Sequence, residues 1–285
     1  MEKIIADFVA KASFHREKSS EKRIDEFEKS RIILSDKHLL IVSKNEKVST
    51  HLKKIFDIRK VDIPDDIRDM MEDSIKIAFT KDGKPGIVVI KGDGDKINKF
   101  SYLLMKLLLK GSRVIYKHPA MKGGVLLKKE WCSGLLNVTR GAILLDGIAI
   151  KLGSVRDIKI ESRSIGKNKA DILNVKMMVS GESFTSYIYV PDKRVMNLLG
   201  RYIGFEYGSM LRTLEKIRLS SLEKQIMQAI YSGVPVDELP LLLNIEASEA
   251  QRIVNNLETK NLLGGGKLTP LGEVAVSRYV EDINV

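Results

Sequence analysis

Residues 131–163 read WCSGLLNVTRGAILLDGIAIKLGSVRDIKIESR, and this stretch decides the fold class. Its Ile, Val and Leu residues form short runs that break at Gly-containing turns, a pattern typical of antiparallel strands. Two similar runs follow, ILNVKMMVS at 172–180 and SFTSYIYV at 183–190. The next segment, 191–208, starts with Pro191 and Asp192, residue types that favour a helix start, so we expect a helix there.

The same order of elements occurs about one hundred residues earlier. Residues 31–91 contain the runs RIILSDKHLLIVS, SIKIAFT and GIVVIKG, which we interpret as strands. KDGKPG at 81–86 has the composition of a hairpin turn. Asp93 then precedes the long apolar segment KINKFSYLLMKLLLKG, which we predict to be a helix.

Several positions in the two regions match at a nearly constant offset, which an internal duplication explains most simply. The matching residues are Leu52, Ile55, Asp57, Ile58, Asp93 and Asn98 in the first copy and Leu152, Val155, Asp157, Ile158, Asp192 and Asn197 in the second. Each copy is predicted to be a meander of about seven strands closed by a C-terminal helix. This is the layout of pleckstrin-homology and GRAM domains; composition alone indicates a small β-barrel or sandwich with one helix.

The last third of the chain is different, because its apolar residues follow helical spacing. Ser220 or Ser221 is a predicted N-cap, and Thr269 and Pro270 form the predicted start of a final helix after the glycine-rich GGGK turn. The order resembles a winged helix-turn-helix domain. We therefore expect an α+β protein with three domains, two tandem pleckstrin-like β-domains at 1–112 and 113–219 and a winged helix at 220–285.

Charge is distributed unevenly along the 285 residues, whose formal net charge is +11. From Ser220 to the end there are five basic and nine acidic residues, a net −4, so the first 219 residues carry +15. The third predicted helix of this domain, EASEAQRIVNNLETK at 246–260, takes the place of the recognition helix and has Glu246, Glu249 and Glu258 against Arg252 and Lys260. Because DNA readers neutralise phosphates with Lys and Arg, we expect no nucleic-acid partner for this domain.

The composition gives no indication of catalysis, a cofactor or a metal. The four histidines lie in separate segments without metal-ligand spacing, and the single cysteine, Cys132, is expected to fill the core. GDGD at 92–95 lacks the remaining ligands of a calcium loop and fits an Asp-capped turn better. The N-terminal apolar run is too short for a secretory signal, and no window is long enough for a membrane span, so we expect a cytoplasmic protein with no membrane insertion.

Together the tandem β-regions, residues 131–163 and the LTPLGE segment at 268–273 resemble the CheF family of archaeal taxis proteins. The resemblance implies a non-enzymatic adaptor at the cytoplasmic face of the archaellum, the rotary motility filament. It would connect a phosphorylated CheY-type response regulator to the archaellum switch complex. A transcriptional regulator that binds DNA through the winged helix, and a peripheral membrane protein that uses the basic β-domains, remain alternatives.

Opposite charges at the two ends of the chain suggest where each partner would bind. For the response regulator we predict an apolar patch with an acidic rim on the C-terminal domain, made of Leu242, Leu243, Ile245, Glu246, Glu249, Glu273, Val276, Tyr279, Val280 and Glu281. For acidic motor components we predict a basic patch made of Lys53, Lys54, Arg59 and Lys60.

Homodimerisation is a further expectation, because the two predicted closing helices carry more apolar residues than a small barrel readily buries. These residues are LLMKLLL at 103–109 together with Met196, Leu199, Ile203 and Leu211.

Overall fold

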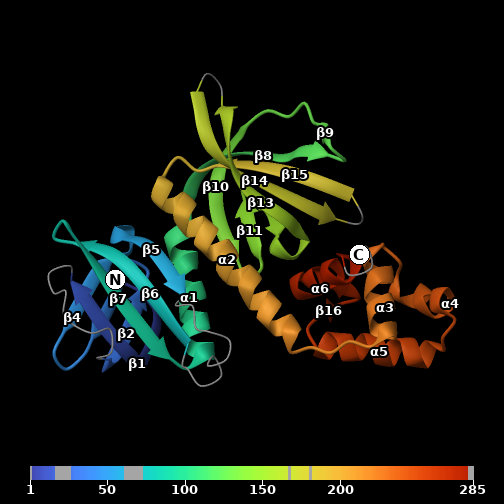
Figure 1. Cartoon of the computed structure of the whole chain (residues 1–285), viewed down its shortest axis with the longest axis horizontal. Coiled ribbons are helices and arrows are strands. Elements are labelled where there is room, and N and C mark those ends of the chain that lie inside the picture. The colour runs from blue at the N-terminus through green and yellow to red at the C-terminus, as the bar shows by residue number, and fades with distance from the viewer. Residues whose placement is uncertain (1, 17–26, 61–72, 166–167, 180–181, 282–285) are drawn as a thin grey trace. The chain divides into compact units, whose positions relative to one another are not determined.

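The computed structural model describes residues 2–16, 27–60, 73–165, 168–179 and 182–281 (Figure 1). Its first seven strands form one antiparallel sheet in the order β4-β3-β2-β1-β7-β6-β5. The bounds are β1 (Ile4–Arg16), β2 (Glu28–Ser35), β3 (His38–Val42), β4 (Lys47–His51), β5 (Ile55–Lys60), β6 (Asp73–Lys81) and β7 (Lys84–Gly92). A 3₁₀ turn, η1 (Leu52–Lys54), connects β4 to β5, and helix α1 (Gly94–Leu109) follows β7.

Local signals in the sequence account for the hairpin and the helix of this first region. Asp82 and Gly83, between β6 and β7, have φ values of 52° and 77°, as the predicted two-residue turn requires. Asp93 caps α1, since its side chain accepts a hydrogen bond from the Lys96 N–H at 3.1 Å. The buried face of α1 includes Phe100 and Leu104, and the helix packs against β6 and β7.

A second sheet repeats the strand order of the first. Its path is β12-β11-β10-β8-β15-β14-β13, and the short strand β9 pairs with β8. The bounds are β8 (Ser112–Lys122), β9 (Val125–Leu126), β10 (Cys132–Thr139), β11 (Ala142–Leu145), β12 (Ile148–Lys151), β13 (Val155–Ile165), β14 (Asn168–Val179) and β15 (Glu182–Tyr189). With β9 set aside, the two sheets have the same topology, as an internal duplication predicts.

Details at the middle of each copy strengthen this equivalence. The 3₁₀ turn η3 (Leu152–Ser154) precedes β13 as η1 precedes β5. Leu52 and Leu152, which open the two turns, are both buried. The next strand has a register shift at the same place in both copies, between Ile55 and Asp57 and between Val155 and Asp157.

The first strand of each copy, β1 and β8, is absent from the sequence-based prediction. Both lie in the middle of their sheets, where β1 joins β2 to β7 and β8 joins β10 to β15. The buried positions of β1 include Ala10, Ala12 and Ser13, which are small and give a weak hydrophobic pattern. β8 contains Pro119, a residue that argues against a central strand when only the sequence is known.

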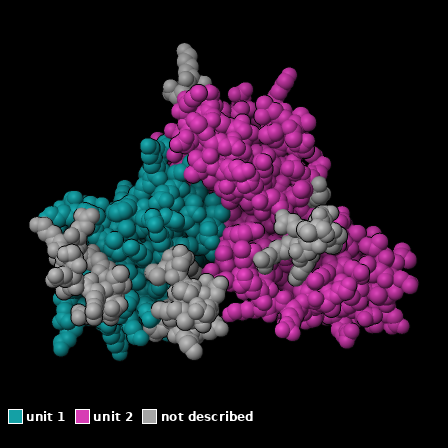
Figure 2. All heavy atoms as spheres, viewed as in Figure 1, with its two compact units in different colours: residues 1–112, 191–205 teal, residues 113–190, 206–285 magenta. Residues whose placement is uncertain are grey.

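The helices that follow the two sheets are not equivalent. By its internal contacts the chain forms two compact units, residues 1–112 with 191–205 and residues 113–190 with 206–285 (Figure 2). Helix α2 (Lys193–Glu215) therefore contributes its first half to the unit of the first sheet, where Arg194 donates to the Ile55 carbonyl at 3.1 Å. The expectation that each helix closes only its own barrel is wrong for α2, and the three-domain division stays a proposal.

The C-terminal part is helical. It contains α3 (Ser221–Tyr231), a 3₁₀ turn η4 (Val236–Glu238), α4 (Leu239–Leu243), α5 (Ala247–Thr259), the hairpin β16 (Leu263–Gly264) and β17 (Lys267–Leu268), and α6 (Pro270–Glu281). Ser220 caps α3 in a reciprocal arrangement with Glu223, whose carboxylate also pairs at 2.6 Å with Lys260, the C-cap residue of α5. The order of elements is compatible with a winged helix, and that assignment remains a proposal.

Candidate functional site

Two neighbouring leucines on α4 form the most exposed apolar feature of the helical part. Leu239 is fully buried, whereas Leu241 is 89% exposed and Leu242 is 56% exposed. In a helix, residues four apart share a face, so Leu239 and Leu243 point to the core and the two leucines between them point away. We call Leu241 and Leu242 the leucine pair. The sequence-based patch contained Leu242 but missed Leu241, which the same spacing rule could have identified.

Acidic side chains flank the leucine pair along the chain on both sides. Asp237 and Glu238 are exposed in η4, immediately before α4. Glu246 is the exposed N-cap residue of α5, and Glu249 lies in the first turn of that helix. α4 and α5 pack together. An apolar contact with acidic surroundings is a form that modest signalling interfaces commonly take.

Asn244 makes the sharp turn that separates the leucine pair from α5. It has φ 51° and ψ 51°, a left-handed conformation that Asn tolerates better than most residues. Its neighbour Ile245 and the last α4 residue, Leu243, pack against the helical core. Leu243 and Ile245 of the predicted patch therefore support the α4–α5 corner and offer only part of their surface to a partner.

Two residues of the predicted patch point inward, and their assignment to an exposed surface is wrong. Val276 is 2% exposed and belongs to the core of the helical part. The side chain of Glu273 is 14% exposed and pairs with Lys151 of β12 at 3.4 Å. The reason is that α6 packs against η3 of the second sheet. The side chains of Tyr279, Val280 and Glu281, which complete the predicted patch, lie outside the described residues.

The contact of α6 with η3 is close enough to exclude a side chain at one position. A Cβ added to Gly153 would lie 2.3 Å from the Pro270 carbonyl oxygen. Burial raises the pKa of Glu273 above its ordinary value, although the charge and hydrogen bond of Lys151 oppose the increase. The Oε2 atom of Glu273 is buried and has no hydrogen-bond partner. Glu273 is therefore a residue of an internal packing surface, not an acidic rim residue.

In the basic patch predicted on the first sheet, Arg59 already has an acidic partner. Lys53 and Lys54 are exposed in η1, and Arg59 is exposed in β5, while the side chain of Lys60 lies outside the described residues. Asp57 accepts from Arg59 at 2.6 Å and from Arg201 of α2 at 3.0 Å. Burial raises the pKa of Asp57, but the two arginines outweigh this and hold it below its ordinary value. Arg59 is thus already paired, and Lys53 and Lys54 are the exposed lysines of this patch among the side chains that the structure describes.

Metal-ligating side chains do not cluster in the described part of the chain. It contains no group of three or more His, Cys, Asp and Glu side chains that could hold a metal ion. Cys132 is exposed, so the expectation that it fills the core is wrong. The described helices include none that is long and apolar enough to cross a membrane.

Comparison with known proteins identifies a family and two relatives to which this chain is similar. The family described as Archaeal Chemotaxis signal transduction system protein F matches residues 4–209. Taxis protein CheF2 of Halobacterium salinarum is 31% identical over 263 residues, which cover 90% of this chain and 92% of the relative. Taxis protein CheF1 of the same organism is 22% identical over 238 residues, 81% of this chain and 79% of the relative.

Proposed function

The chain belongs to the archaeal CheF family and has a role in chemotaxis signal transduction, and we propose that it acts there as a non-enzymatic adaptor. In this proposal one surface binds a phosphorylated CheY-type response regulator. Another surface binds the switch complex of the archaellum, at the cytoplasmic face of the motor. The chain changes the direction of rotation by connecting the two partners and catalyses no reaction itself.

The leucine pair is the observation that carries this proposal. Leu241 is 89% exposed and Leu242 is 56% exposed on a short helix whose first and last leucines, Leu239 and Leu243, pack in the core. Exposed apolar side chains beside acidic ones suit a partner face that combines an apolar depression with basic residues. A regulator face with basic residues would complement Glu246 and Glu249. Activation by phosphorylation would raise affinity by shifting the regulator toward the conformation that fits this patch.

The switch complex is the proposed partner of the first sheet. Lys53 and Lys54 are exposed in the η1 turn and have no acidic residue in that turn. A partner with an acidic surface would be attracted to this end of the chain and repelled from the acidic helical part. The opposite charges would thus keep the two partners from exchanging places.

Burial of apolar side chains within the chain weakens the sequence-based argument for homodimerisation. Leu104, Met105, Leu108 and Leu109 of α1 are buried within the chain, as are Leu199 and Ile203 of α2. These are six of the ten apolar side chains that suggested a second copy, and the other four, Leu103, Leu107, Met196 and Leu211, are partly buried. The dimer stays a proposal, and light scattering at micromolar concentration that gives the monomer mass would reject it.

Charge reversal at the acidic flank tests the proposed binding surface. Glu246→Lys combined with Glu249→Lys should slow association with the phosphorylated response regulator by about threefold to tenfold at low salt, and less at high salt. The control is Glu215→Lys, which makes half of that charge change at an exposed position at the end of α2 and should have less than half of the effect. Stopped-flow association kinetics measure the effect. Equal slowing by both variants would contradict a specific surface, and a salt-sensitive shift of duplex DNA would favour the regulator alternative.

A further inference from the structure

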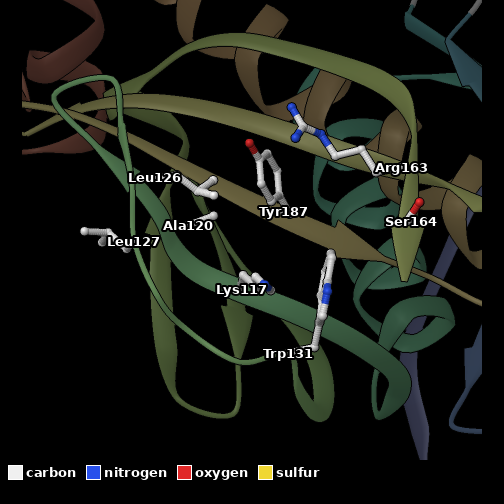
Figure 3. A pocket seen from close by; sticks show the side chains of 8 residues that line it. All are labelled: Lys117, Ala120, Leu126, Leu127, Trp131, Arg163, Ser164 and Tyr187. Carbon is white, nitrogen blue, oxygen red and sulfur yellow. The ribbon is translucent and has the colours of Figure 1, made fainter. Parts of the chain in front are cut away.

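A small cavity opens on the second sheet, away from the sequence segments that carry the leucine pair. Its volume is about 240 Å³, and its lining residues come from β8, β9, the segment after β9, β13 and β15. Figure 3 shows the lining side chains, which are Lys117, Ala120, Leu126, Leu127, Trp131, Arg163, Ser164 and Tyr187. A water molecule occupies roughly 30 Å³ of liquid, so the cavity can hold about one large apolar side chain.

Two aromatic rings and two cations give this cavity its chemistry. The ring centroids of Trp131 and Tyr187 lie 6.4 Å apart. The Lys117 ammonium lies 5.2 Å from the centre of the Trp131 ring, and the Arg163 guanidinium lies 4.2 Å from that of Tyr187. Such contacts hold the cations over the ring faces without neutralising them.

The two cations differ in whether they already have a carboxylate partner. Arg163 pairs with Glu161, from its Nη2 to the Oε2 of the carboxylate at 2.9 Å. Lys117, in contrast, has no carboxylate partner anywhere in the described ranges. None of the eight lining residues is acidic. The cavity therefore offers one cation without a counter-charge directly beside an aromatic surface.

Apolar surface continues outside the cavity. Val125 and Leu126 of β9 are 66% and 67% exposed. The segment that follows carries the exposed Lys128 and Lys129 and the exposed Glu130, which together have a net charge of +1. A ligand that enters the cavity would thus meet further apolar surface and further positive charge at its rim.

We propose that this cavity binds an acidic peptide segment of a partner protein that inserts one apolar side chain beside Trp131. The inserted side chain would contact Trp131 and Leu126, and a neighbouring carboxylate would pair with Lys117. A bilayer is a poorer match for this site. A single concave cavity fits one side chain, whereas a protein binds a membrane surface through a broad apolar and basic face. This site does not rest on the response-regulator proposal, since it uses no residue of α4 or α5.

The only tryptophan of the chain, Trp131, provides a built-in reporter for the test. The full-length protein is titrated with a glutamate-rich heptapeptide that has one central phenylalanine, and the emission of Trp131 is followed. A saturable change is expected. Replacing the phenylalanine by serine in the peptide should raise the Kd at least about fivefold, because the cavity then stays unfilled.

Protein variants separate the two parts of the site. Lys117→Met, which keeps the stem length and removes the charge, should raise the Kd about fivefold to tenfold. Leu126→Ser should raise it about threefold. Lys81→Met is the matched control, because Lys81 is exposed at the β6–β7 hairpin of the first sheet, and it should leave the Kd unchanged. Circular dichroism checks that every variant is folded.

Four results would overturn the proposal. These are no change in emission up to millimolar peptide, equal affinity of wild type and Lys117→Met, equal affinity for the phenylalanine and serine peptides, and a response to phosphatidylglycerol vesicles but not to the peptide. The last result would identify a membrane surface instead. Binding of the phosphorylated response regulator by the same variants is measured separately, so that failure of either site is recognised by itself.

Discussion

The two sheets have the same strand order, yet the turn between their fourth and fifth strands serves different purposes. In the first copy the turn η1 is Leu52, Lys53 and Lys54, and both lysines are exposed. In the second copy η3 is Leu152, Gly153 and Ser154, and all three residues are buried. The buried leucine at the first position is common to both and anchors the turn. The comparison teaches that a buried leucine is what the two turns have in common. The residue types at the next two positions differ according to whether another element packs on the turn.

Helix α6 accounts for the difference at the second position. The Pro270 carbonyl approaches Gly153 so closely that a Cβ would lie 2.3 Å from it, whereas Lys53 carries a full side chain that reaches solvent. Glycine thus allows a helix to pack where the other copy presents a cation. The position before the turn follows the same logic. His51 caps η1 by accepting from the Lys53 N–H at 3.1 Å, and Lys151 instead pairs with Glu273 of α6.

Introducing the first copy's residue into the second turn should have the largest effect. Gly153→Lys would force α6 away from η3, and we expect it to lower the free energy of unfolding by about 3 kcal/mol. Urea denaturation followed by circular dichroism measures the loss. The reverse exchange, Lys53→Gly, is the control and should cost about 1 kcal/mol or less. It removes only exposed atoms, and the remaining cost is the backbone entropy that glycine loses on folding. Equal losses would mean that the α6 contact does not select glycine.

The aspartates after the two turns provide the next comparison. Asp57 has a side chain that is 14% exposed and binds two arginines, whereas Asp157 is 33% exposed and faces two lysines. Asp57→Asn should cost about 2 kcal/mol at neutral pH, since hydrogen bonds to charged groups are lost. Asp157→Asn should cost clearly less.

The pH dependence of the Asp57 effect follows from the direction of its pKa shift. The folded-state pKa of Asp57 lies below its ordinary value of 3.8, so its contribution is complete above that value and is lost as pH falls through the folded-state pKa. Denaturation at several pH values should show the difference between wild type and Asp57→Asn shrinking only in acid. A difference that grows in acid would contradict the assigned ion pairs.

A smaller effect is expected at Lys151, which is itself 55% exposed. Lys151→Met should cost about 1 kcal/mol near neutral pH, because it leaves the buried carboxylate of Glu273 with less compensation. Burial raises the pKa of Glu273 above 4.5, so the protonated form is favoured in the folded chain and stability declines as pH rises toward the folded-state pKa. The cost of Lys151→Met should therefore disappear below about pH 4. A cost of Lys151→Met that does not change with pH would show that Lys151 acts only through packing. His51→Ala removes the side chain at the equivalent position of the first copy, which caps η1, and serves as the comparison.

Local features of this fold could be predicted from the sequence because their causes are local. Asp93, Thr269 and either Ser220 or Ser221 were expected at helix starts, and the side chains of Asp93, Ser220 and Thr269 each accept a hydrogen bond from a backbone N–H in the following turn. The Asp82–Gly83 turn is another example. The constant offset between the copies also indicated the duplication, which the shared strand order supports.

Long-range packing explains what the sequence could not reveal. Glu273 was expected on an acidic surface, but its partner Lys151 lies 122 positions earlier in the chain, and no local pattern relates them. The central strand β1 was missed because its buried positions are small residues. The first half of α2 joins the unit of the first sheet through Arg194 and Arg201, contacts that only the folded chain reveals. The cavity beside Trp131 likewise combines strands from distant segments.

The central proposal is that a phosphorylated response regulator binds at the leucine pair, and one titration tests it directly. The full chain carrying Leu241→Ser and Leu242→Ser is compared with wild type by biolayer interferometry against the phosphorylated regulator. Leu135→Ser is the control, because Leu135 is 47% exposed on the second sheet. All three proteins should be equally stable within about 0.5 kcal/mol, since these side chains are largely exposed. The double variant should raise the Kd at least about tenfold while the control leaves it unchanged; equal affinity of wild type and the double variant would contradict the proposed site.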